Sequence, residues 1–109
     1  TRELQRLARV HDGHCIVYVF ADSSEGVAAR CFFQGASAGG EDPASGSACA
    51  NLGGYLLSRG TPPPFTRRIS QGTSIGRPSQ LELHVDSNQR IFVTGRVHDL
   101  GSGTIELAG

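Results

Sequence analysis

The sequence predicts an α+β fold in which about six strands, forming a curved and mainly antiparallel sheet, surround one buried apolar helix. Two observations carry this prediction. Runs rich in β-branched and aromatic residues lie on both sides of the middle of the chain, and one stretch of small residues and leucines with helical periodicity lies between them. With 109 residues, the chain is expected to form one domain over its whole length, 1–109.

The N-terminal third predicts a short helix and a β-hairpin. Leucine and alanine recur at helical spacing in Arg2–Arg9, which predicts an amphipathic helix. His14–Phe20 and Val27–Phe33 are rich in aliphatic and aromatic residues, and the polar turn Asp22–Gly26 separates them. These two runs are therefore expected to pair as a hairpin.

The middle of the chain predicts a loop followed by a helix. Gln34–Ser47 is rich in glycine and serine and is expected to be a loop without a core of its own. From Ser47 to about Ser58, small and apolar residues surround most of the circumference, so this helix is expected to be buried on nearly all sides. The pair Arg59-Gly60 and the prolines at 62–64 predict its end.

The C-terminal part predicts β-structure. Leu81, Leu83 and Val85 alternate with polar residues, which is the period of a half-exposed strand. Strands are expected at four places: Phe65–Gln71, Gln80–Val85, Arg90–Val97 and Gly103–Leu107.

Charge and hydropathy argue against several classes of protein. Ten Lys and Arg balance ten Asp and Glu, so the chain lacks the basic excess of a nucleic-acid binder and no nucleic-acid partner is expected. The longest apolar run, Cys15–Ala21, is far shorter than the ~20 residues that a membrane helix needs, so no membrane association is expected. Thr1–Arg9 is charged and has no apolar segment of signal-peptide type.

The cysteines and histidines predict neither a disulfide framework nor a metal site. Cys15, Cys31 and Cys49 are odd in number and form no CxxC pair, so they are interpreted as small hydrophobic residues in a cytoplasmic protein. His11 and His14 are three residues apart, but no third ligand has a suitable spacing.

The stretch with the most chemical information is Glu41–Ala48, which reads Glu-Asp-Pro-Ala-Ser-Gly-Ser-Ala. It opens the predicted helix, whose first N–H groups lack internal partners and carry the positive end of the helix dipole. Gly46 leaves room for a ligand, and Ser45 and Ser47 add hydroxyl donors, so a carboxylate fits there with Asp42 at its edge. A simpler interpretation stays open, because Ser or Asp before a helix is commonly an N-cap worth about 1 kcal/mol.

Five short segments follow one another in the chain: Arg30-Cys31-Phe32-Phe33, Glu41–Ala48, Gln71-Gly72, Gly76-Arg77-Pro78-Ser79 and Val93-Thr94-Gly95. In this order they resemble the C-terminal half of the PhzF-like family of phenazine-biosynthesis proteins. That family typically shows R-x-F, E-D-P-A-T-G-S-A, Q-G and G-R-P-S at similar separations. The resemblance covers the chain from about His14 to Leu107.

This resemblance implies a fold and an activity. The family has the diaminopimelate-epimerase-like fold, in which two similar domains, each a barrel-like sheet around a central helix, enclose the substrate. It implies an isomerase or epimerase that acts by proton transfer on a small carboxylate without a cofactor. The family's acid/base Glu belongs to an N-terminal half that this sequence does not contain. The implied partner is therefore that missing half or a second copy in a homodimer.

The resemblance also assigns roles to residues. It places Asp42, Gly46 and Ser47 at the substrate, with Asp42 as the catalytic candidate. Ser45 stands where the family usually has Thr, keeps the hydroxyl and is grouped with the substrate-binding residues. Cys49 falls inside the helix, where it is interpreted as a core thiol and not as a racemase-type cysteine.

Two further positions allow two interpretations each. Arg77 has the fork that binds carboxylates, but a surface arginine in a rigid turn is the preferred interpretation. Gln71 either places an amide near the cleft or caps the end of a strand.

Two functions stay open at this point. The chain is expected to be half of a PhzF-like isomerase, or else a stand-alone domain that binds a small carboxylate or acts as a scaffold without catalysis. The missing general base favours the second function, whereas the retained Asp42 and Gly46-Ser47 favour ligand binding in both cases. The substrate itself is not identified by this reasoning.

Overall fold

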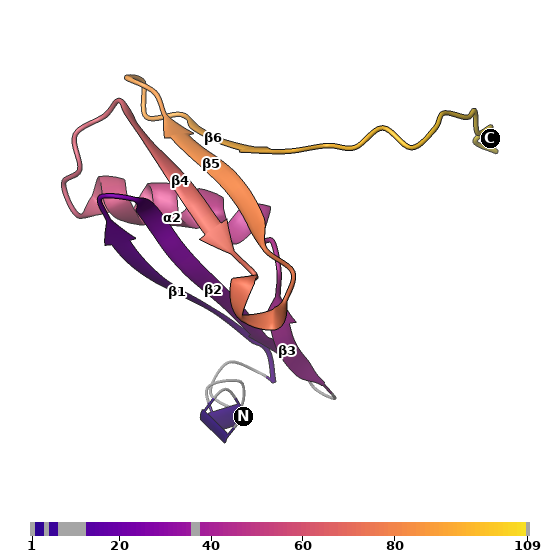
Figure 1. The fold of residues 1–109 in the computed structure, drawn as a ribbon, viewed down its shortest axis with the longest axis horizontal. Coiled ribbons are helices and arrows are strands. Elements are labelled where there is room, and N and C mark those ends of the chain that lie inside the picture. Colours follow the sequence, from indigo (N-terminus) through magenta and orange to yellow (C-terminus); the bar gives the residue numbers. More distant parts are fainter. Residues whose placement is uncertain (1, 4, 7–12, 36–37, 109) are drawn as a thin grey trace.

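The computed structural model describes residues 2–3, 5–6, 13–35 and 38–108. In these residues six strands form one sheet, and a 13-residue helix lies across one of its faces, which confirms the α+β prediction (Figure 1). The elements in chain order are β1 (Cys15–Ser23), β2 (Gly26–Gln34), β3 (Gly39–Asp42), α2 (Gly46–Ser58), β4 (Phe65–Gln71), the 3-10 turn η1 (Thr73–Ile75), β5 (Ser79–Val85) and β6 (Ile91–Gly95).

The sheet has the order β1-β2-β4-β5-β6, with β3 also paired to β2. Its strand pairs are antiparallel except for β2 and β4, which run parallel over Val27–Ala29. Because β1 follows one whole edge of β2, β3 and β4 share the other edge. Gln71 at the end of β4 pairs with Ala29, and Asp42 at the end of β3 pairs with Cys31. The ends of β3 and β4 are therefore neighbours.

The core lies between α2 and the face of the sheet that it covers. Alternate residues of each strand point to this face, because side chains in a strand alternate with a period of two. Gly53 of α2 faces the sheet, and a Cβ on it would lie 3.1 Å from both Leu83 Cδ1 and Ile91 Cγ2. A residue without a side chain thus lets the helix approach the sheet closely. The buried residues of this cluster are Val27, Ala29, Cys49, Leu52, Phe65, Ile69, Leu83 and Val85.

The position and the end of α2 were predicted correctly. The helix begins at Gly46, one residue before the predicted start, and ends at Ser58. Gly60 has a φ of 94°, and its N–H donates to Leu57 O at 3.0 Å, while the Thr61 N–H donates to Leu56 O at 3.0 Å. These two bonds and the left-handed glycine form a Schellman motif, which stops the helix where the Arg59-Gly60 pair predicts.

The prediction that α2 is buried on nearly all sides was wrong, and so was the predicted barrel. Burial is confined to one side of the helix, at Ala48, Cys49, Leu52 and Gly53, whereas Tyr55 is 50% exposed. The physical reason is that the sheet remains open and covers a single face of the helix (Figure 1). No strand from the described residues lies over the opposite face.

The glycine-rich stretch before α2 contains a strand that the sequence pattern did not predict. Gly39–Asp42 pairs with Cys31–Gln34 of β2. A Cβ on Gly40 would lie 3.0 Å from Phe33 Cζ, so the aromatic ring packs against bare backbone. Pairing through backbone groups needs no side chain, which is why alternation of apolar residues fails to reveal β3.

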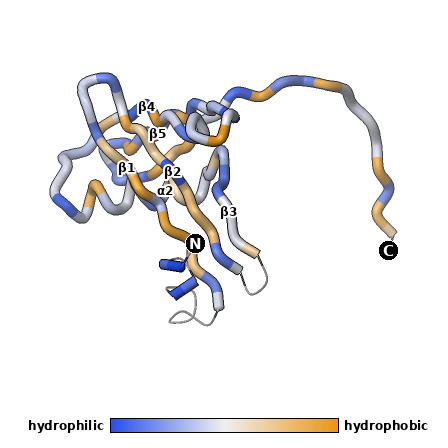
Figure 2. Tube along the Cα trace, turned by 60° about the horizontal axis from the view of Figure 1, so that its bottom comes forward, coloured by the Kyte–Doolittle hydropathy of each residue, from blue (hydrophilic) through white to orange (hydrophobic). Residues whose placement is uncertain are grey.

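The predicted strand Gly103–Leu107 was wrong, and β6 ends at Gly95 instead of Val97. Residues 96–108 follow β6 as an extended chain without strand pairing, and all of them are exposed (Figure 1). Hydrophobic residues recur along this tail (Figure 2), among them Leu100, which is 96% exposed. The β-type composition is present, but the tail pairs with no strand of the part of the chain that the structure describes.

The N-terminal helix prediction is only partly testable. Residues 2–3 and 5–6 are helical, while the rest of Arg2–Arg9 and the whole of His11 lie outside the described residues. Across the described ranges, no helix combines the length and the apolar character needed to cross a membrane.

Candidate functional site

Segments that are far apart in the sequence meet where α2 begins. The loop from Asp42 to Ser45 connects β3 to α2, and the end of β4 and the start of β5 contact this loop. Gln71 of β4 reaches it across 29 positions of sequence and Ser79 of β5 across 36. Three of the five segments that carry the family resemblance therefore form one cluster.

Asp42 is turned back toward this loop. Its Oδ1 accepts a hydrogen bond from the Ala44 N–H at 3.2 Å, and its Oδ2 accepts one from the Ser45 hydroxyl at 2.6 Å. The first of these bonds forms an Asx-turn, in which a side chain substitutes for a backbone acceptor. In this arrangement Asp42 braces the loop, and its role in catalysis stays a prediction.

Gln71 and Ser79 hold the loop from the side of the sheet. Gln71 is fully buried, and its Nε2 donates to Asp42 O at 2.8 Å and to Ser45 Oγ at 3.1 Å. Its Oε1 is buried and has no partner among the described residues. The Ser79 hydroxyl donates to Pro43 O at 2.7 Å and lies 3.2 Å from Gln71 O. These bonds fix two successive carbonyl groups of the loop.

The first turn of α2 is uncapped. Ser45 occupies the N-cap position with extended backbone angles, φ −129° and ψ 99°, but its side chain makes no cap hydrogen bond. Within the described residues, the N–H groups of Gly46, Ser47 and Ala48 have no acceptor. Gly46 and Ser47 are exposed. Free N–H groups at the positive end of a helix dipole attract a carboxylate or another oxyanion.

Glu41, the other carboxylate of the motif, is neutralised by an arginine on the neighbouring strand. Arg30 Nη2 lies 2.7 Å from Glu41 Oε1, and Arg30 Nε lies 3.1 Å from Oε2. This two-pronged hydrogen bond holds the pKa of Glu41 below its ordinary value. The Arg30 guanidinium also stacks over the Phe32 ring, 4.9 Å from its centre. Glu41 is therefore engaged as an ion-pair partner at neutral pH.

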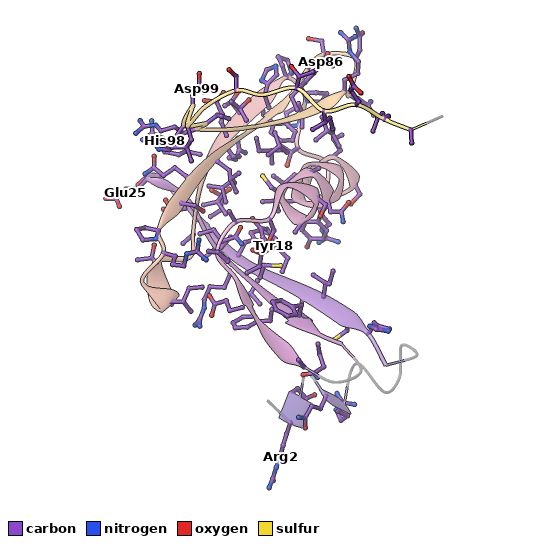
Figure 3. The ribbon with its side chains drawn as sticks, turned by 90° about the vertical axis from the view of Figure 1, so that its right-hand side faces the viewer. Arg2, Tyr18, Glu25, Asp86, His98 and Asp99 are labelled. Carbon is purple, nitrogen blue, oxygen red and sulfur yellow. The ribbon has the colours of Figure 1, made fainter. Side chains whose placement is uncertain are left out.

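A mainly apolar cavity of about 370 Å³ lies between β1 and α2 and begins beside Ser47. Figure 3 shows Tyr18 on the side of β1 that faces α2. Ser47 and Ala48 of the first helical turn are part of its lining, so the cavity offers apolar contacts next to that turn. The remaining lining residues are Ile16, Phe20, Asn51, Leu52 and Tyr55. A larger cavity of about 700 Å³ includes Pro78 and Ser79 but none of residues 42–48.

The structure places Asp42, Ser45, Gly46 and Ser47 close together, which is expected for residues so near in sequence. Cys49 points into the core, is fully buried and has a pKa raised by burial, in keeping with a core thiol. No group of three His, Cys, Asp or Glu side chains in the described parts of the chain is arranged to hold a metal ion.

Arg77 and Gln71 each match one of their sequence interpretations, whereas a third position was missed. Arg77 is exposed in the turn before β5, and its N–H donates to Gly72 O at 3.0 Å, which agrees with the preferred surface interpretation. Gln71 does place an amide at the site, and there it contacts the loop. Sequence reasoning missed Ser79, although its place in the Gly-Arg-Pro-Ser segment was a signal that the position matters.

Comparison with known proteins identifies a family and a relative. The model of the family described as phenazine biosynthesis-like protein matches residues 4–101. An uncharacterized isomerase of Pasteurella multocida is 46% identical over 76 residues, which are 70% of this chain and 26% of the relative. The chain thus spans about a quarter of the length of the curated relative that it matches. No solved structure matches the chain significantly.

The family match includes all five of the segments named above, and three of them meet at the uncapped start of α2. The extent of the match and the identity to the isomerase lead to one conclusion: the chain belongs to the phenazine biosynthesis-like protein family.

Proposed function

We propose that this chain is half of a PhzF-like isomerase that holds a small carboxylate substrate at the start of α2. The observation that carries the proposal is the uncapped first turn, where three successive N–H groups lack an acceptor within the described residues. Gly46 and Ser47 contact the carboxylate, Ser45 and Asp42 shape the loop below it, and the adjacent apolar cavity receives the rest of the molecule.

The reaction we propose is proton transfer without a cofactor, in a cytoplasmic protein with a diaminopimelate-epimerase-like architecture. The isomerase name of the matched relative supports the reaction class. Both carboxylates of the motif are engaged, Glu41 with Arg30 and Asp42 with its own loop. We therefore propose that the main acid/base group comes from outside these 109 residues, either from an N-terminal half or from a second copy of the chain. Strands from that partner would also complete the open side of the sheet.

The same engagement of Glu41 and Asp42 favours a second candidate for the isolated chain, a domain that binds a small carboxylate without catalysis. The two candidates differ in turnover. Mixing the chain with an N-terminal half of the relative restores isomerase activity if the first holds, whereas binding without turnover in every mixture supports the second.

Ligand binding is tested by titrating the isotope-labelled chain with benzoate and following backbone amide shifts. Benzamide, which has the same ring without the negative charge, is the matched control. Benzoate is expected to shift the amides of Gly46, Ser47 and Ala48, and benzamide is not. Ser47→Ala is expected to weaken benzoate binding about two- to tenfold, which corresponds to the net worth of a typical hydrogen bond, about 0.5–1.5 kcal/mol. Asp42→Asn should also weaken it by loosening the loop. Affinity unchanged by both substitutions places the ligand elsewhere.

A further inference from the structure

Ser45 stands at the position where serine normally caps a helix, yet it does not cap α2. An N-cap serine accepts a hydrogen bond from the second or third helical N–H, which here belong to Ser47 and Ala48. Neither bond is present. A strong capping residue is therefore held in a non-capping state.

The hydroxyl of Ser45 is engaged both as a donor and as an acceptor, and these two bonds direct it away from the first helical turn. It donates a hydrogen bond to Asp42 Oδ2 at 2.6 Å and accepts one from Gln71 Nε2 at 3.1 Å. The direction of this chain is fixed, because a carboxylate only accepts and the Gln71 amide nitrogen only donates. Ser45 is 7% exposed, so water has little access with which to replace either partner.

Gln71 is itself held rigidly. It is the last residue of β4, pairs with Ser79 of β5, and is fully buried. Its Nε2 also donates to Asp42 O at 2.8 Å, so a single amide group grips the loop at two points. Gln71, a side chain on the sheet, thus acts together with Asp42 to determine where the Ser45 hydroxyl points.

We infer that Gln71 is a positioning residue that keeps the Ser45 hydroxyl from capping α2, so that the N–H groups of the first turn stay free for an anion. Without the Gln71 amide, the loop loses two hydrogen bonds and Ser45 is free to turn toward the Ser47 and Ala48 N–H groups. The serine then competes with the ligand for the same donors. The consequence for ligand affinity rests on the proposed function, whereas the state of Ser45 does not.

The first test needs no ligand and measures amide hydrogen exchange at Ser47 and Ala48 in the chain itself. Ser45→Ala is expected to leave these exchange rates unchanged, because the hydroxyl does not cap. Gln71→Met keeps the shape of the side chain and removes its donors. It is expected to slow exchange at Ser47 or Ala48 about fivefold, the effect of gaining an N-cap. Ser45→Ala combined with Gln71→Met removes that slowing.

Two results overturn the inference at this stage. Faster exchange in Ser45→Ala means that the serine already caps the helix in the native chain, and this result does not depend on whether Gln71→Met folds. Exchange that is unaltered in a folded Gln71→Met variant means that the amide does not control Ser45.

The second test measures benzoate affinity in the same four proteins. Gln71→Met is expected to weaken binding about fivefold in the native background, because an N-cap of ordinary strength competes with the ligand. In the Ser45→Ala background the same substitution is expected to weaken binding less than about twofold, because no competing hydroxyl remains. Equal weakening in both backgrounds indicates a purely structural role for Gln71 and overturns the inference. Absence of benzoate binding by the native chain counts against the proposed function alone, since the exchange rates still test Gln71.

Discussion

Replacing Gly72 by alanine tests whether the Gln71-Gly72 segment must lie directly against the loop before α2. Gly72 follows β4 with a φ of 82°, in the left-handed region. A Cβ at this position would collide with the carbonyl oxygen of Arg77 and would lie 2.7 Å from that of Pro43. Both obstacles are backbone atoms, so a side-chain rotation cannot relieve the contact.

The expected loss of stability has two parts. A left-handed conformation costs alanine about 1–2 kcal/mol relative to glycine. Forcing an extra methyl group into packed surroundings costs about 1–3 kcal/mol more. Gly72→Ala is therefore expected to lower the free energy of unfolding by about 2–5 kcal/mol, a large share of the roughly 5–15 kcal/mol of a typical domain.

Gly76→Ala is the matched control, because Gly76 has a φ of 71° at the other end of the same 3-10 turn and its Cβ would meet no atom within 4 Å. This variant is expected to lose only the conformational part, about 1–2 kcal/mol. Urea unfolding of both variants, followed by circular dichroism, gives the difference directly. Losses that agree within about 0.5 kcal/mol would refute the close contact between Gly72 and the loop.

Three further predictions concern other parts of the molecule. Burial raises the pKa of Tyr18 above its ordinary value of 10, and its hydroxyl has no partner among the described residues. The contribution of this group to stability is therefore present below about pH 10 and is lost above it. Tyr18→Phe should unfold at a similar or higher urea concentration than the native chain near neutral pH, and it should lose less stability in alkali. An equal loss of stability in alkali for both proteins would contradict this prediction. The pKa of Glu41 is lowered from 4.5 by Arg30, so its contribution is present above about pH 4.5 and lost as the pH falls further; thermal melts of Glu41→Gln should vary less over that acid range than those of the native chain. The exposed apolar tail predicts self-association. Sedimentation equilibrium should therefore give the native chain a mass above that of its monomer, whereas a chain ending at residue 95 should have its monomer mass. A monomer mass for both proteins would contradict this prediction.

The helix and most strands could be predicted because their signals are local. Apolar residues surround much of α2, and the Arg59-Gly60 pair supplies the left-handed stop that the structure contains. In β5, Leu83 and Val85 are buried, while Glu82 is exposed and His84 is only partly buried, as the alternation predicts. A pattern of this kind arises as soon as one face of a helix or strand is covered, which is the case for both elements.

The errors arose where a partner segment decides the outcome. Gly39–Asp42 becomes a strand because β2 offers a free edge beside it, and glycine-rich sequence carries no sign of that edge. Gly103–Leu107 has β-type residues but meets no edge among the described residues, so the same composition stays unpaired. The prediction that α2 is buried on nearly all sides failed for a related reason. Apolar residues around a helix do not show by themselves which of its sides the rest of the fold covers, and here the sheet covers one.

The features of the candidate site also fall into those that local sequence predicts and those that depend on a distant segment. The anion-attracting helix end could be predicted from Glu41–Ala48 alone, since it depends on a helix start and small residues. The residues that keep it open could not, because Gln71 and Ser79 reach the loop only after β4 and β5 pair. Much of the motif therefore holds the loop, while the N–H groups of Gly46, Ser47 and Ala48 have no acceptor among the described residues. Substitutions at Gln71 or Ser79 should then change ligand affinity through loop geometry, at a distance from any atom that touches the ligand.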